Sequence, residues 1–198
     1  MPLIPTTPAP NEIHQLQLDQ LDAFLRESEL ILAAWNIYSD QHTDLDGWPY
    51  DDDAYGLRAA QRDADTADAF EAVREQAHQL LATAEIQLAS LPARAVQNRW
   101  VWQLGTLRDA LARLDALHDE WLQTLDSLPA DTRPGTEVFD DALAAHHAEA
   151  WSSLDDWATH GHIIRDIHAA ARNAPSALAP APTTTAASVP GRHSPARR

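Results

Sequence analysis

A stripe of large side chains at alternating steps of four and three, from residue 100 to residue 128, constrains this chain more than any other feature. Such steps place side chains on one face of an α-helix, in the coiled-coil type of seam that packs against other helices. The pattern therefore predicts a long helix and places its one polar member, His118, on the buried seam. The stripe consists of Trp100, Leu104, Leu107, Leu111, Leu114, His118, Trp121, Leu125 and Leu128.

Apolar residues at helical spacing predict four helices in all, over residues 11–38, 57–90, 92–128 and 136–173. Pro and Gly residues mark the connections between them. Gly161, inside the fourth helix, predicts close packing or a bend at that point. Four long helices with mostly short connections predict an all-α fold, an elongated antiparallel four-helix bundle with up-down-up-down topology.

The two ends of the chain differ from the middle in composition. Residues 1–10 contain four Pro, and residues 174–198 are rich in Pro, Ala and Thr and carry three Arg but no acidic residue. Segments of this kind cannot bury enough apolar surface to fold. We therefore expect both ends to be disordered and the bundle to occupy residues 11–173.

The formal net charge is −16 at pH 7, with 30 acidic residues against 14 basic ones, all of them Arg. Such a surface repels nucleic acid and anionic lipid, so neither is expected as a direct partner. The longest apolar run, residues 30–35, is far shorter than the ~20 residues of a membrane helix. The first ten residues have no basic region followed by an apolar one, as a secretory signal would. We expect a cytoplasmic protein.

A cluster of His and carboxylate residues is the strongest hint of chemistry. If the third predicted helix folds back on the fourth about a turn near residue 132, position 118 lies level with 146, and position 115 with 149. Imidazole and carboxylate ligands in a bundle core suit Zn, Fe or Mn. The sequence thus offers a candidate divalent-metal site and no other cofactor; alternatively, His118 is an ordinary core residue. The candidate ligands are Asp115, His118, His146, His147 and Glu149.

Three more histidines lie near the end of the fourth predicted helix. His160 and His168 are eight residues apart and share a helix face, whereas His162 points elsewhere. We interpret this group as part of a solvated surface.

Aromatic and acidic residues are mixed in the loop predicted after the first helix, residues 39–56, which contains six Asp. Arg or Lys of a basic partner can pair with a carboxylate and stack on an aromatic ring. The loop therefore predicts a partner-binding surface; alternatively, its rings cover one end of the bundle. The candidate residues are Trp48, Tyr50, Asp51, Asp52, Asp53 and Tyr55.

No nucleophile motif or Gly-rich phosphate loop is present, and the chain has no Cys, so no catalytic residue is predicted. The sequence favours a non-enzymatic, acidic helical interaction protein with a protein partner. Homodimerisation is one version, through Val101, Trp102 and Trp151 if they form one exposed patch. The alternatives are a metal-binding helical bundle and an inhibitor that mimics DNA with its carboxylates.

Overall fold

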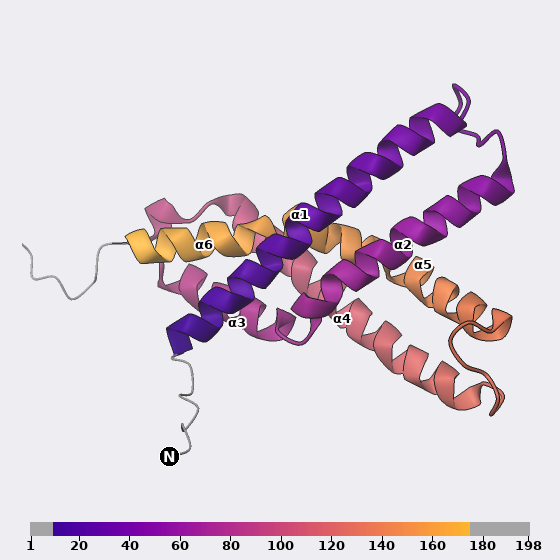
Figure 1. Ribbon diagram of the computed structural model, residues 1–198. Helices are drawn as coiled ribbons and strands as arrows, with labels where there is room; N and C mark the ends of the chain where they lie inside the picture. The colour runs from indigo at the N-terminus through magenta and orange to yellow at the C-terminus, as the bar shows by residue number, and fades with distance from the viewer. Residues whose placement is uncertain (1–9, 175–198) are drawn as a thin grey trace, which may run out of the picture.

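Six α-helices and one short 3-10 helix make up residues 10–174, the part of the chain that the computed structural model describes (Figure 1). No strand forms within these residues, so the predicted all-α class is confirmed. None of their helices combines the length and the apolarity that a bilayer crossing needs. The predicted disordered ends lie outside the described residues, apart from residues 10 and 174. The elements are α1 (Pro10–His42), α2 (Asp52–Arg74), α3 (Ala77–Ser90), η1 (Ala93–Ala95), α4 (Asn98–Ser127), α5 (Glu137–His160) and α6 (His162–Asn173).

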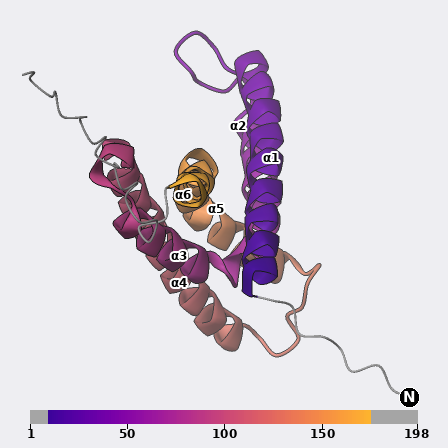
Figure 2. The same cartoon turned by 90° about the vertical axis from the view of Figure 1, so that its left-hand side faces the viewer.

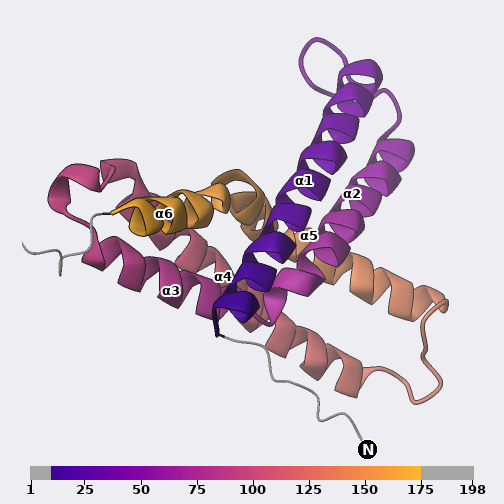
Figure 3. The ribbon, with the colours of Figure 1, turned by 60° about the vertical axis from the view of Figure 1, so that its left-hand side comes forward.

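The helices are arranged as three pairs that meet in a common core. α1 packs along α2, α4 packs along α5, and α3 packs beside α6. α5 and α6 lie between the α1–α2 hairpin and the α3–α4 pair (Figure 2). α2 also packs against α5, which ties the two hairpins together. Away from the core the pairs diverge (Figure 3), so the single up-down-up-down bundle that the sequence predicts is not what forms.

The prediction of one helix over residues 57–90 is wrong at residues 75–76, where α2 ends before α3 begins. The N–H of Gln76 donates to the carbonyl oxygen of Val73 over 3.0 Å, a tighter turn than the α-helical one. Neither residue 75 nor residue 76 is Gly or Pro, so the sequence carries no local signal for the break. As a result α2 packs on α5, whereas α3 packs on α4 and α6.

Gly161 separates α5 from α6, and the predicted close packing is confirmed. Its φ of −57° suits any residue, so glycine is not required here for its conformational freedom. The reason is space: a Cβ at this position would lie 2.6 Å from the Trp157 carbonyl oxygen and 3.1 Å from Leu25 Cδ2. The missing side chain lets α1 approach the junction of α5 and α6.

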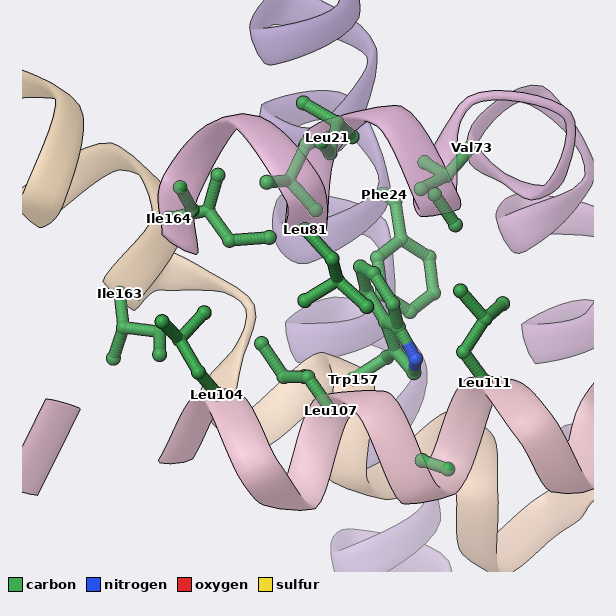
Figure 4. Close-up of a cluster of buried hydrophobic side chains, with 14 of the residues drawn as sticks. Leu21, Phe24, Val73, Leu81, Leu104, Leu107, Leu111, Trp157, Ile163 and Ile164 are labelled. Atoms are coloured by element: carbon green, nitrogen blue, oxygen red, sulfur yellow. The ribbon is translucent and has the colours of Figure 1, made fainter. Parts of the chain in front are cut away.

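The core is centred on Trp157, whose side chain is fully buried. Its ring meets Phe70 of α2 edge-on at a centroid distance of 5.3 Å, and Phe70 meets Phe24 of α1 at 5.1 Å. Leu107 and Leu111 approach the indole from α4 (Figure 4). One buried cluster therefore joins all six helices. Its members from α3 and α6 include Leu81, Ile163 and Ile164.

His118 is not on the buried seam, and that prediction is wrong. The buried positions next to it on α4 are Leu114 and Leu117, and His118 itself is exposed. α3 begins level with Asp115, whose carboxylate lies 2.9 Å from the ring of His78. From Asp115 toward its C-terminal end, α4 no longer lies beside α3 and packs along α5 instead. The buried face of α4 therefore includes Leu117 and not His118.

Two glycine substitutions should have opposite effects on stability. Gly161→Ala is expected to destabilise the protein by about 1–3 kcal/mol, because the new methyl group overpacks the α1 contact. Gly105→Ala, inside α4 with nothing within 4 Å of the added Cβ, is expected to stabilise it by up to about 1 kcal/mol. Urea unfolding followed by far-UV circular dichroism measures both. Equal stability of the two variants would contradict this account of the junction.

Candidate functional site at the tip of the first hairpin

The α1–α2 hairpin projects away from the core and presents the loop that the sequence singles out (Figure 1). We define the hairpin tip as residues 37–57: the last turns of α1, the loop of residues 43–51 and the first turns of α2. The tip contains six Asp and no Arg. The hairpin tip is therefore the acidic end of a projecting pair of helices.

Hydrogen bonds fix the loop of the hairpin tip. One carboxylate oxygen of Asp44 accepts from the backbone N–H groups of Asp46 and Trp48, each over 2.9 Å. The N–H of Asp44 donates to the Trp48 carbonyl over 2.8 Å, and the N–H of Tyr50 donates to the His42 carbonyl over 2.9 Å. The backbone that carries Trp48 and Tyr50 is thus held on both sides.

Two of the predicted partner-binding residues have structural roles. Asp51 caps α2, where its carboxylate accepts from the N–H of Ala54 over 3.0 Å. Tyr55 is half-buried: its hydroxyl lies 2.8 Å from that of Ser39, and its ring meets Trp35 edge-on at 5.0 Å. For Tyr55 the structure matches the alternative interpretation, a ring that covers the end of the helices, because it packs between α1 and α2 at the end of the hairpin.

Trp48 and Tyr50 are different, since each is 72 % exposed. Asp52 and Asp53 beside them are exposed as well. A loop backbone that is already fixed loses little freedom when a partner binds, and large aromatic rings are the usual anchors of protein interfaces. The hairpin tip thus offers apolar anchors within a negative field. Further exposed apolar residues of the tip are Ile37, Leu45 and Leu57.

An arginine that the sequence analysis missed fastens the hairpin to α5. The guanidinium of Arg62 lies 4.4 Å from the ring centre of Trp35 on α1 and 3.7 Å from that of Trp151 on α5. It also donates to one carboxylate oxygen of Asp63 over 2.6 and 2.8 Å, and both side chains of this ion pair are largely buried. The three residues of the stack come from three helices, so no local spacing in the sequence could have revealed it.

The predicted metal ligands do not come together. Asp115 contacts His78 of α3 at 2.9 Å, Glu149 contacts Arg113 of α4 at 3.2 Å, and His118 is exposed. Between residues 10 and 174, no group of three or more His, Asp and Glu side chains is placed to hold a metal ion. Each carboxylate of the predicted cluster therefore has a separate partner.

His146 and His147, the other two predicted ligands, face different neighbours. The ring of His146 stacks on Trp121 of α4 at a centroid distance of 5.3 Å. Burial, and next the adjacent His147, lower the pKa of His146. Burial also lowers the pKa of His147, although the carboxylates of Asp68 and Asp63 on α2 oppose that shift. Both imidazoles are therefore mainly neutral at pH 7.

The three residues considered for a homodimer surface are not equivalent. Val101 and Trp102 are each 62 % exposed on α4. Trp151 is half-buried and packs under Arg62, so it serves the contact between α2 and α5 instead.

No protein-family model matches this chain, and neither the curated proteins nor the solved structures compared with it include a match. Its function is therefore argued from its own surfaces.

Stability should fall on mild acidification because of the two half-buried histidines of α5, His146 and His147. A pKa that is lower in the folded state than in the unfolded chain means that the unfolded chain binds protons first as the pH falls. This contribution is fully present above the unfolded pKa of about 6.5, and it is lost as the pH falls below that value and through the lower folded pKa. Urea unfolding at about pH 7.5 and pH 5.5 measures the loss.

The matched variant for this test is His147→Gln, which keeps a polar side chain but cannot take up a proton. It should lose less stability over the same pH range than the wild type. His162→Gln, at an exposed position of α6, serves as the control and should behave as the wild type does. An unchanged pH dependence in His147→Gln would show that other groups cause it.

Proposed function

We propose that this protein is a non-enzymatic, acidic interaction protein of the cytoplasm that binds a basic segment of a partner protein with its hairpin tip. The observation that carries the proposal is the exposure of Trp48 and Tyr50 on a loop whose backbone is fixed by hydrogen bonds. Arg and Lys side chains of the partner would stack on these rings and pair with Asp52 and Asp53.

The exposed rings, the acidic charge and the fixed loop of the hairpin tip all favour binding of a basic partner. Moving a large aromatic side chain from water into an interface stabilises a complex by about 2–3 kcal/mol. The hairpin tip has two such rings exposed to water. The six Asp of the tip would raise the rate at which a basic partner arrives and would disfavour acidic ones. The fixed loop lowers the entropic cost of binding.

A direct test uses the full chain and a fluorescently labelled peptide that alternates Arg with Leu. Trp48→Ala combined with Tyr50→Ala should weaken binding about tenfold or more, because it removes both stacking surfaces and leaves the charge unchanged. Fluorescence anisotropy gives the Kd, and raising the salt concentration should weaken the binding of the wild type.

The matched control is Trp102→Ala, which removes an indole of similar exposure from α4. It should bind the peptide as the wild type does. Equal affinities for all three proteins would mean that the peptide responds only to the overall negative charge, and the hairpin tip would lose its assigned role. Circular dichroism should show that the helices of each variant are intact.

A further inference from the structure

Two histidines far apart in the sequence face each other where α1 passes α6. Nε2 of His14 lies 3.3 Å from Nδ1 of His168, and the ring centres are 4.9 Å apart. The side-chain amide of Gln87 on α3 also reaches Nδ1 of His168, at 3.1 Å. His168 is half-buried and thus not part of the solvated face that the sequence suggested.

Side-chain amides lie beside both rings. Gln17, a buried residue, donates through Nε2 to Gln79 over 2.7 Å and turns its Oε1 toward Nδ1 of His14 at 3.5 Å. With its proton on Nδ1, facing Gln17, the neutral His14 ring has a lone pair on Nε2 that can bind a metal ion. The Gln87 amide nitrogen donates to Nδ1 of His168, which then carries a lone pair too. Nδ1 of His168 thus lies at hydrogen-bond distance from both Gln87 and Nε2 of His14, and a metal ion bound by the two rings would replace these hydrogen bonds.

The separation of the two nitrogens fits a shared metal ion. Two nitrogens bound to one tetrahedral zinc ion at 2.0–2.1 Å lie about 3.3–3.4 Å apart. Gln87 offers a third ligand, because its Oε1 is buried and has no hydrogen-bond partner among the described residues. A rotation of that amide would exchange its nitrogen for this oxygen beside His168.

We propose that His14, His168 and Gln87 form a site for a divalent transition-metal ion, of which Zn²⁺ is the model. Nε2 of His14, Nδ1 of His168 and the amide oxygen of Gln87 are its protein ligands. A pocket of about 340 Å³ lined by His14 and His168 gives room for water as a fourth ligand. The contact of His14 with Gln17 is the outer hydrogen bond that orients a ligating imidazole.

The charges around the site keep the His168 ring neutral but do not attract a cation. Burial, then His14, Arg172 and Arg165 lower the pKa of His168, which keeps its ring in the neutral form that binds metal. Arg165 is paired with Asp22, so its charge is partly compensated. Arg172 lines the pocket and opposes the cation. The site thus gains its affinity from its ligand geometry and not from the local charge.

The experiment is a titration of the metal-free full chain with ZnCl₂, followed by isothermal calorimetry. The wild type should bind one Zn²⁺ per chain. His14→Ala and His168→Ala should each weaken that binding at least tenfold. Zinc should also raise the Tm of the wild type and not that of the variants, because the ion links α1 to α6.

His162→Ala is the matched control, since it removes an exposed histidine from the same helix as His168. It should bind zinc as the wild type does. If His168→Ala loses helicity, His168→Gln replaces it, because the amide can still hydrogen-bond Gln87. Absence of binding by the wild type, or equal binding by the wild type and the His14 and His168 variants, would overturn the proposal.

Discussion

The burial of one indole, that of Trp157, is the constraint on which the arrangement of the helices depends. A side chain of this size needs partners on every side, and it finds Phe24, Phe70, Leu107 and Leu111 on three other helices. The helices cross one another around Trp157, and side chains fill a core only near that crossing. The helices are longer than that core, so their far ends run on as pairs with few additional neighbours. The diverging shape follows from the position of the largest buried residue.

The hairpin tip is a consequence of that divergence. Beyond the core, α1 and α2 pack mainly against each other. Arg62, which lies between the rings of Trp35 and Trp151, fastens this pair to α5. The guanidinium stacks on both rings, and Asp63 accepts hydrogen bonds from its Nε and one Nη. The chain then ends the hairpin with a hydrogen-bonded loop. Trp48 and Tyr50 stay exposed to water because no other helix within residues 10–174 reaches them.

The candidate site was predictable only in part. Trp48, Tyr50 and the Asp residues could be found because an acidic loop with aromatic residues stands out in composition. The role of Tyr55 could not, because it depends on Trp35 and Ser39 of the preceding helix. The prediction of the metal ligands assumed four straight, aligned helices whose residues could be matched at one height along the bundle. The break at residues 75–76 means that α2 and α3 are not one straight helix, so the assumption fails. The pair His14 and His168 is separated by 154 positions, and no local pattern connects its members.

The sequence by itself determined the helices, their apolar faces, the acidic surface and the positions of most connections, because these depend on spacing and composition within a few turns. The tertiary structure decided where a helix breaks without Gly or Pro, that Leu117 is buried and His118 of the stripe is exposed, and which distant side chains meet. Those outcomes depend on which neighbour covers each turn of a helix. That competition among packing partners is settled only when all six helices are assembled around Trp157.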